Sequence, residues 1–385
     1  MKKFLAMALA LLMVCVMLPV VAMAATTLPE AVDGVIKLTE NVDLAAMAVV
    51  GEEGSNLTLD LNGFTITRSG TVLDVYGTLK IIDSSSAKTG KVVSTENNAM
   101  WINDNTKVTM EAGTFEGKAY GIVVAGKNAE FTMNGGAATA TEGSGISGNG
   151  NETNGTPDFA PTTITINGGV VTGSDAGIYH PQVGTLNING GSISGGSGIE
   201  MRAGTLNVTG GTITATAGAV AVTPNGNGPT TAGAAIAVSQ HTTKHEITVN
   251  VNGGKLTGAA AINEANPQEN AETDTNKIAI TVNGGSLEGK VQKESAANMV
   301  IKGGTFTDKE GAKDYLEDGL KLNADGKVVP ESITIIVPSE GGSTTTTPST
   351  DTTKNPSTGA NDFVGVAAAA AVMALLGSAV VLRKK

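Results

Sequence analysis

The feature that most constrains this chain is a short glycine motif that recurs along it. Asn-Gly-Gly stands at 134–136, 167–169, 189–191, 252–254 and 283–285, with variants at 209–211 and 302–304. From Gly113 onward, the second glycine of each motif follows the previous one by 23, 33, 22, 20, 43, 31 and 19 residues. A base period of about 20 residues, with one doubled and two stretched steps, predicts a solenoid in which each repeat forms one coil.

Between the glycines, short segments alternate apolar and polar side chains. In the repeat from Gly184 to Arg202, the side chains expected to face inward are Leu186, Ile188, Ile193, Ile199 and Met201. Each segment is too short for a sheet of its own, but stacked coils join such segments into long parallel sheets around a shared core. The sequence therefore predicts an all-β chain, a parallel β-helix of about ten coils. A leucine-rich repeat has a similar period, but its helical half is missing here.

The surplus of glycine has a structural reason in such a fold. The chain has 51 glycines, and no strict Gly-X-Y period accompanies them, which excludes collagen. Glycine suits the corners between strands because it accepts positive φ values that other residues resist. Asparagine is the next most tolerant residue there. We therefore expect Asn134, Asn167, Asn189, Asn252 and Asn283 to stack as a structural ladder at one corner.

The rest of the composition limits the possible fold classes and binding partners. Only 3% of the residues are aromatic and 16% are charged, which disfavours a helical bundle and implies a core of small and branched aliphatic side chains. Acidic residues number 36 against 25 basic ones. A nucleic acid or an anionic membrane surface therefore has no electrostatic basis as a partner.

The first 24 residues have the pattern of a secretory signal peptide. Lys2 and Lys3 precede an apolar stretch over 4–18, and Ala22-Met23-Ala24 matches the small residues before a cleavage site, which we place between Ala24 and Ala25. An uncleaved membrane anchor is the alternative, but the apolar stretch is shorter than the roughly 20 residues that span a bilayer. Cleavage would remove Cys15, the single cysteine of the chain.

The other end combines a linker, a pentapeptide and an apolar run. A Gly/Ser/Thr/Pro tract over 339–354 predicts an extended linker, and a mostly apolar run over 363–382 ends in Arg383-Lys384-Lys385. Between them stand Asn355, Pro356, Ser357, Thr358 and Gly359. This order over 355–385 resembles the cell-wall sorting signal of Gram-positive surface proteins, whose recognition motif is Leu-Pro-x-Thr-Gly.

The resemblance implies a partner and a destination. A sortase cysteine would attack the Thr358 carbonyl, release Gly359 onward and pass Thr358 to an amine of a peptidoglycan precursor. The segment 363–382 would hold the chain in the membrane only before sorting. Asn355 stands where the commonest motif has Leu, which leaves the sortase class open, and a plain single-pass anchor is the alternative. Removal of both ends takes away five positive and one negative side chains and moves the net charge from −11 to −15.

The remaining chain divides into caps and repeats. We expect an N-terminal cap over 25–56, β-helical coils over 57–306 and a C-terminal cap over 307–338 that includes a short helix at 312–320. The region 57–306 resembles the right-handed, pectate-lyase-like β-helices of bacterial surface proteins, which include adhesins and carbohydrate-active enzymes. Such a fold does not by itself determine a function.

The stretched steps of the repeat indicate where a site could lie. The extra residues fall at one phase of the repeat, as inserts over 148–161, 223–233 with 240–245, and 263–276. Inserts at one phase emerge along one edge of a solenoid, where loops on a rigid scaffold often bind partners. The alternative is that a β-helix merely tolerates insertions there.

One cluster next to these inserts has chemical variety. Tyr179 and Glu200 occupy equivalent positions in adjacent coils and are expected to point outward side by side, with His180 and Arg202 nearby. An aromatic ring beside a carboxylate and a guanidinium could grip a sugar or a peptide, so these four residues are the candidate ligand site. The alternative is a solvated Glu–Arg pair of small energetic value beside an exposed tyrosine.

Catalytic and metal-binding patterns are weaker. The repeats contain no row of adjacent aspartates of the kind that pectate-lyase-type elimination requires, and no pair of carboxylates is suggested for glycoside hydrolysis. His241 and His245 stand in an insert rather than on a helix, so a zinc site is disfavoured. We predict no catalytic residue, no metal site and no cofactor, although the acidic surface leaves Ca²⁺ binding open.

Together these patterns predict a secreted, non-catalytic protein attached to the cell wall of a Gram-positive bacterium. We expect it to be an adhesin that binds a host or dietary glycan or another surface macromolecule. The alternatives are a polysaccharide lyase or glycoside hydrolase that acts on a pectin-like or mucin-type glycan, and a structural spacer.

Overall fold

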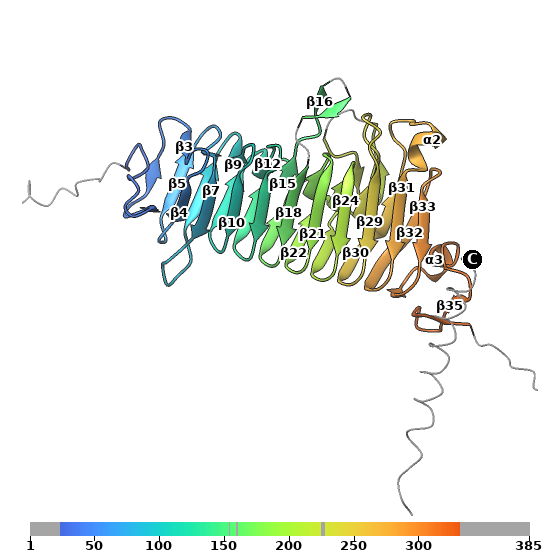
Figure 1. Ribbon diagram of the computed structural model, residues 1–385. Coiled ribbons are helices and arrows are strands. Elements are labelled where there is room, and N and C mark those ends of the chain that lie inside the picture. The colour runs from blue at the N-terminus through green and yellow to red at the C-terminus, as the bar shows by residue number, and fades with distance from the viewer. Residues whose placement is uncertain (1–23, 154, 159–160, 225–227, 332–385) are drawn as a thin grey trace, which may run out of the picture. The chain divides into compact units, whose positions relative to one another are not determined.

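The computed structural model describes residues 24–153, 155–158, 161–224 and 228–331 (Figure 1). The predicted linker, sorting signal and membrane segment lie outside these residues, as does the signal peptide up to residue 23. Within the described ranges, no helix is both long enough and apolar enough to cross a membrane.

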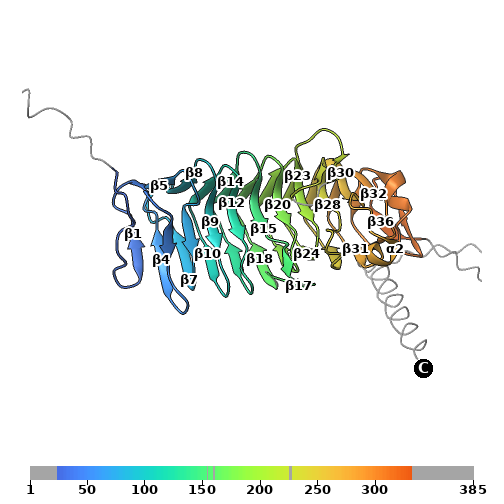
Figure 2. The same ribbon diagram turned by 90° about the horizontal axis from the view of Figure 1, so that it is seen from above.

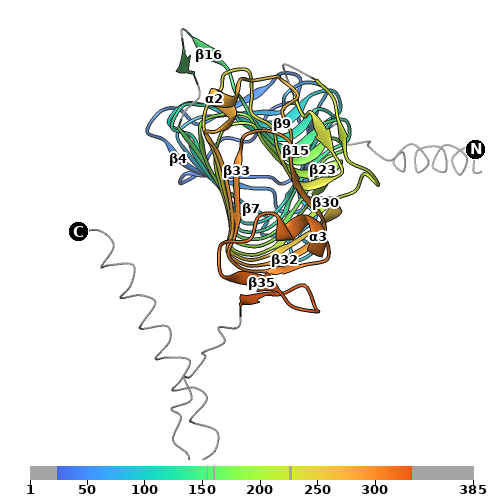
Figure 3. The same ribbon diagram turned by 90° about the vertical axis from the view of Figure 1, so that its right-hand side faces the viewer.

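The described chain winds as a parallel β-helix, which confirms the predicted fold class. Each coil contributes short strands that pair in parallel with the strands of the coils before and after it, and these strands build three faces, which Figure 2 shows from above and Figure 3 shows along the stack. Face 1 is an 11-stranded sheet, and a 19-stranded sheet turns a corner to form faces 2 and 3.

Face 1 contains β1 (Val35–Lys37), β4 (Asn56–Asp60), β7 (Thr78–Ile82), β10 (Lys107–Met110), β13 (Glu130–Met133), β18 (Thr162–Ile166), β21 (Gly184–Ile188), β24 (Gly204–Val208), β29 (Ile247–Val251), β31 (Ile278–Val282) and β33 (Asn298–Ile301). Face 2 contains β2 (Val42–Asp43), β5 (Thr65–Arg68), β8 (Lys91–Ser94), β11 (Thr114–Gly117), β14 (Ala137–Ala140), β19 (Val170–Thr172), β22 (Ser192–Gly195), β25 (Thr212–Ala215), β34 (Thr305–Phe306) and the first parts of β30 (Lys255–Glu264) and β32 (Ser286–Lys293). Face 3 contains β3 (Ala48–Val50), β6 (Leu73–Val75), β9 (Asn98–Ile102), β12 (Tyr120–Val124), β15 (Ser144–Gly148), β20 (Ala176–His180), β23 (Ser197–Met201), β28 (Ala234–Val238) and the second parts of β30 and β32.

The core is a set of aliphatic rows that run from coil to coil. Leu186 pairs in register with Leu206, and Ile188 pairs with Val208, and all four side chains are fully buried. Burial of each such side chain contributes about 1.5–3 kcal/mol. Because the same inward positions recur in every coil, the packed rows set the register between coils.

The two glycines of each corner motif have different roles. Gly191 has a φ of +81°, which favours glycine. At Gly190 a Cβ atom would lie 2.4 Å from the carbonyl oxygen of Asn167 in the preceding coil, so a side chain there would collide with backbone. The predicted ladder is present beside them, because Nδ2 of Asn189 donates to Oδ1 of Asn167 at 2.9 Å and Nδ2 of Asn167 donates to Oδ1 of Asn134 at 2.8 Å. Asn283 and Asn252 repeat this contact at 2.8 Å.

The N-terminal prediction was wrong by one coil. Residues 25–56 were expected to form a cap, but β1 pairs in parallel with β4, so the first coil begins at Val35. The edge of this coil is partly covered by the residues before it, through single bridges from Ala25 to Val42 and from Val32 to Val35.

The C-terminal helix also differs from the prediction. Helix α3 spans Lys309–Lys313, where the Asp308 side chain accepts from the Gly311 amide, and not 312–320. The following residues pair with the last strand of face 1 instead, because the Ile301 amide donates to the Tyr315 carbonyl and the Glu317 amide donates to the Ile301 carbonyl. A hairpin of β35 (Leu320–Leu322) and β36 (Val328–Pro330) follows. Closure of an exposed strand edge therefore overrides local helix propensity.

Candidate functional site

An outward-facing row of side chains runs along face 3, one from each coil. In register, this row contains Asp74, Trp101, Val123, Ser147, Tyr179, Glu200, Ala237 and Asn263. Neighbouring coils are separated by about 4.8 Å, the spacing of strands in a sheet. Side chains far apart in the sequence are thereby brought into contact along one face.

Face 3 gathers most of the aromatic side chains that carry a polar group. The sequence has one tryptophan and four tyrosines. Trp101, Tyr120 and Tyr179 belong to strands of face 3, and Tyr76 directly follows β6 of the same face. By contrast, Phe115, Phe131 and Phe306 are buried in the core. Because the chain has few aromatic residues, their concentration on one stretch of face 3 distinguishes this stretch from the rest of the surface.

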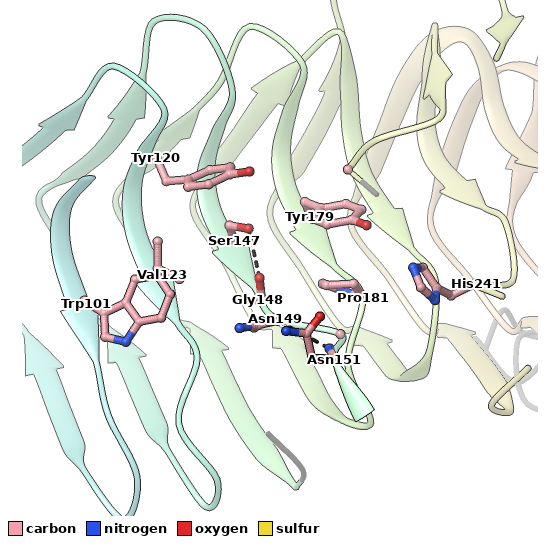
Figure 4. A pocket seen from close by; sticks show the side chains of 12 residues that line it. Trp101, Tyr120, Val123, Ser147, Gly148, Asn149, Asn151, Tyr179, Pro181 and His241 are labelled. Atoms are coloured by element: carbon pink, nitrogen blue, oxygen red, sulfur yellow. Dashed lines mark hydrogen bonds between the residues drawn. The ribbon is translucent and has the colours of Figure 1, made fainter. Parts of the chain in front are cut away.

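Trp101, Tyr120 and Tyr179 line a hollow of about 210 Å³, which we call the aromatic hollow (Figure 4). Its remaining lining comes from face 3 and from the inserts: Val123, Ser147, Gly148, Asn149, Gly150, Asn151, Pro181, Gly228 and His241. Trp101 and Tyr120 are half-buried, whereas Asn151 is exposed. The hollow therefore combines ring surfaces with amide, hydroxyl and imidazole groups that can hydrogen-bond.

The inserts meet at one edge, as the phase of the repeat predicts. The first insert forms a hairpin of β16 (Glu152–Thr153) and β17 (Thr156–Pro157), which Figure 1 shows rising above the coils on the same side as helix α2 (Glu272–Thr275) of the last insert. Nε2 of His245 lies 2.8 Å from Oε2 of Glu152, so two inserts are in direct contact.

A second link joins the later inserts, because Nδ2 of Asn270 donates to Oε1 of Gln240 at 3.0 Å. The insert at 223–233 is held by a short hairpin of β26 (Ala221–Val222) and β27 (Thr231–Ala232). The edge beside the hollow is thus an assembly of inserts that contact one another.

Tyr179 and Glu200 lie side by side in register, as expected, but neither is exposed as predicted: Tyr179 is only 5% exposed, and Glu200 is covered completely. It has no exposed surface, because the segment Gly228–Thr231 packs over it. The Thr230 amide donates to both carboxylate oxygens, at 2.9 and 2.8 Å, and the Thr231 amide donates to Oε2 at 3.2 Å. The hydroxyls of Thr230 and Ser239 also donate to Oε1, the latter at 2.8 Å.

Arg202 completes this buried network. It has no exposed surface, and its Nη1 donates to the Gly228 carbonyl at 2.8 Å while its Nε donates to the Ser239 carbonyl at 3.3 Å. Burial raises the pKa of Tyr179 to about 12, against the opposing effect of the nearby Arg202 guanidinium and Gly228 backbone. Burial likewise raises the pKa of Glu200, against the opposing effect of its hydrogen bonds and of Arg202.

Two expectations about this cluster are therefore corrected. The alternative of a solvated Glu–Arg pair was wrong, because both side chains are fully buried. A ligand on the surface cannot touch Glu200 or Arg202 either, and of the four predicted ligand residues Tyr179 is the one that lines the hollow. The physical reason is that the insert segment Gly228–Thr231 packs against these side chains, and the alternation of side chains along a strand cannot predict such a contact.

His180 points into the core instead of toward a ligand. Its side chain is fully buried and pairs in register with Met201 of the next coil. Burial lowers its pKa to about 4, and although the Gly184 backbone approaches the ring, neither ring nitrogen has a hydrogen bond of good geometry within the described residues.

The two histidines of the segment 240–245, which belongs to the second insert, contact different neighbours. His241 lines the hollow, and its Nδ1 accepts from the Thr243 amide at 3.3 Å, whereas His245 pairs with Glu152. Across the part of the chain that the structure describes, no three His, Cys, Asp or Glu side chains are grouped so that they could hold a metal ion.

Trp101, Tyr120 and Asn149 were missed by the sequence prediction. A usable signal existed for Trp101, because Met100-Trp101-Ile102 has the same in-out-in pattern as Ile178-Tyr179-His180. The early coils lack the full Asn-Gly-Gly motif, so their phase could not be read with the same clarity.

Comparisons with known proteins add no relative. No protein-family model matches the chain, and no curated protein and no solved structure shows significant similarity to it.

Proposed function

We propose that this protein is a surface-displayed binding protein that holds a glycan in the aromatic hollow of face 3. The observation that carries the proposal is the gathering of Trp101, Tyr120 and Tyr179 around one hollow in a chain with 3% aromatic residues. Rigid aromatic side chains with a polar end are the residues that binding surfaces prefer.

The chemistry of the lining supports a sugar as the ligand. Aromatic rings offer flat apolar surfaces on which the C–H face of a sugar ring can stack. Asn149, Asn151 and Ser147 add amide and hydroxyl groups that can pair with sugar hydroxyls.

The location of the protein follows from its ends. The proposed signal peptide exports the chain, sortase joins Thr358 to peptidoglycan, and the linker over 339–354 separates the β-helix from the wall. A rod that carries its hollow on one side would then present it to glycans outside the cell.

The binding proposal is tested by a glycan array followed by titration calorimetry. Replacement of Trp101 by Ala is expected to weaken binding at least about tenfold, because loss of a stacking aromatic anchor costs 2 kcal/mol or more. Tyr120→Phe, which keeps the ring, is expected to retain most of the affinity.

Val170→Ala serves as the matched control, because Val170 is an exposed apolar residue of face 2, 46% exposed and outside the hollow. Equal affinity of Trp101→Ala and Val170→Ala would contradict the proposed site. A wild-type protein that binds no glycan would support the spacer alternative, and release of new reducing ends or unsaturated products would support the enzyme alternative.

The sorting proposal has its own prediction. Thr358→Ala is expected to move the protein from the cell-wall fraction to the membrane fraction, because it removes the threonine side chain that the sorting motif has at this position. Ser357→Ala is the matched control, because that motif position accepts different residues, and it should leave the protein on the wall. Wall attachment of Thr358→Ala that resists boiling in detergent would show that another segment anchors the chain.

A further inference from the structure

We infer that Glu200 and Arg202 are positioning residues for the aromatic hollow: they fix the Gly228–Thr231 segment against Tyr179 and so set one wall of the hollow. The inference rests on the proposed function for its effect on binding. Its structural part, the fixing of the wall, can be tested without any ligand.

The first step is that one short segment receives nearly all the polar contacts of the Glu200 carboxylate. The amides of Thr230 and Thr231 and the hydroxyl of Thr230 all donate to it. Ser239 of the neighbouring coil supplies the remaining contact, at 2.8 Å. Two adjacent amides on one carboxylate fix both the position and the rotation of the segment, which apolar packing would not do.

The second step is that Gly228 links Arg202 to the wall of the hollow. Its carbonyl accepts from Nη1 of Arg202 at 2.8 Å. Gly228 and Tyr179 both line the hollow. The Arg202 guanidinium and the Gly228 backbone also lie close enough to the Tyr179 hydroxyl to lower its pKa, so one buried cation lies beside a backbone group and a ring of the same wall.

The third step is that two charges buried near each other contribute little to stability, because their removal from water costs about as much as their attraction returns. The hydrogen bonds of these two side chains instead fix the orientation of the segment that they contact, since each hydrogen bond is geometrically specific. The network therefore acts on the shape of the hollow, even though neither charged side chain can touch a ligand.

The structural part is tested by hydrogen exchange of the full chain. Glu200→Gln keeps the shape of the side chain but presents an amide group to the donors of Thr230 and Thr231. Exchange of the amides over 228–231 is expected to become at least about tenfold faster, which is about 1.4 kcal/mol of local stability. Glu130→Gln is the control, because Glu130 pairs with Lys107 at 2.9 Å on the exposed surface of face 1, whereas the segment 228–231 packs against face 3.

The effect on binding is tested with two gentler variants. Thr230→Val removes the hydroxyl donor but keeps the volume, whereas Thr230→Ser keeps the donor. We expect Thr230→Val to weaken binding of the glycan identified by the array about three- to tenfold while the protein stays folded with a lower melting temperature, and Thr230→Ser to restore wild-type affinity.

The outcomes separate this inference from the function on which it rests. Unchanged exchange over 228–231 in Glu200→Gln would overturn it, and so would faster exchange combined with wild-type affinity in both Glu200→Gln and Thr230→Val. Failure of the wild-type protein to bind any glycan would instead overturn the proposed function, and the exchange result alone would then decide whether the pair fixes the wall.

Discussion

Glu200→Ala is expected to lower the free energy of unfolding by about 2 kcal/mol or more, because it removes the acceptor of several buried hydrogen-bond donors. The carboxylate is fully buried, and its loss leaves the Thr230 and Thr231 amides without their acceptor and Arg202 without its counter-charge. Urea or thermal unfolding would measure the change, with the coils of face 3 beside the segment 228–231 as the region first affected.

Two controls make this prediction specific. Glu130→Ala removes an exposed carboxylate and should cost less than about 1 kcal/mol. The double variant Glu200→Leu with Arg202→Met replaces both charges by apolar side chains and should be more stable than Glu200→Ala, because no unpaired buried charge remains. A loss below about 1 kcal/mol for Glu200→Ala would show that the carboxylate is not enclosed.

Acid is expected to destabilise the wild-type protein more than the variant His180→Met. The pKa of His180 is about 4 in the folded protein, below the value of 6.5 for an unperturbed imidazole, because burial disfavours its charged form. As the pH falls below about 6.5, the unfolded chain takes up this proton before the folded chain does, and stability decreases until about pH 4. The difference corresponds to roughly 3 kcal/mol.

The test compares wild type and His180→Met at pH 7 and at pH 4.5. The titration of carboxylates is common to both proteins, so the difference between the two pH-induced losses isolates His180. At pH 7 the variant should be at least as stable as wild type, since methionine fills the space without a buried polar atom that lacks a partner. Equal pH-induced losses in the two proteins would contradict the burial of the imidazole.

The sequence carried most of the information about the coils. Gly190 and Gly191 mark a corner, because a side chain would collide with backbone at Gly190 and φ is positive at Gly191. Both constraints recur in each coil at the same phase. The Asn134–Asn167–Asn189 ladder follows from the same repetition. A periodic sequence lets each coil predict the next one.

Features that depend on contacts between non-periodic segments could not be predicted in this way. Alternation along β23 correctly places Glu200 on the outside of its coil, but only the fold shows that Gly228–Thr231 covers it. The helix expected at 312–320 failed for a similar reason, because residues 315–317 pair with Ile301 at the open edge of face 1. In both places a tertiary hydrogen bond outweighs the local pattern.

The candidate site was predictable from the sequence only in part. The inserts were placed correctly at one edge by their phase, and Tyr179 was selected from a coil with clear flanking motifs. Trp101 lies three coils earlier in the same outward row, where the motif is incomplete. The hollow became visible only when the parallel register aligned these coils.

The central claim, that a glycan occupies the aromatic hollow, is tested most directly by the fluorescence of Trp101, the one tryptophan of the chain. If a glycan selected on the array occupies the hollow, its binding should cause a saturable change in the Trp101 emission and should protect this residue from acrylamide quenching, both with the dissociation constant that calorimetry gives. Saturation of the protein with a bound glycan while the emission and quenching of Trp101 stay unchanged would contradict binding in the hollow.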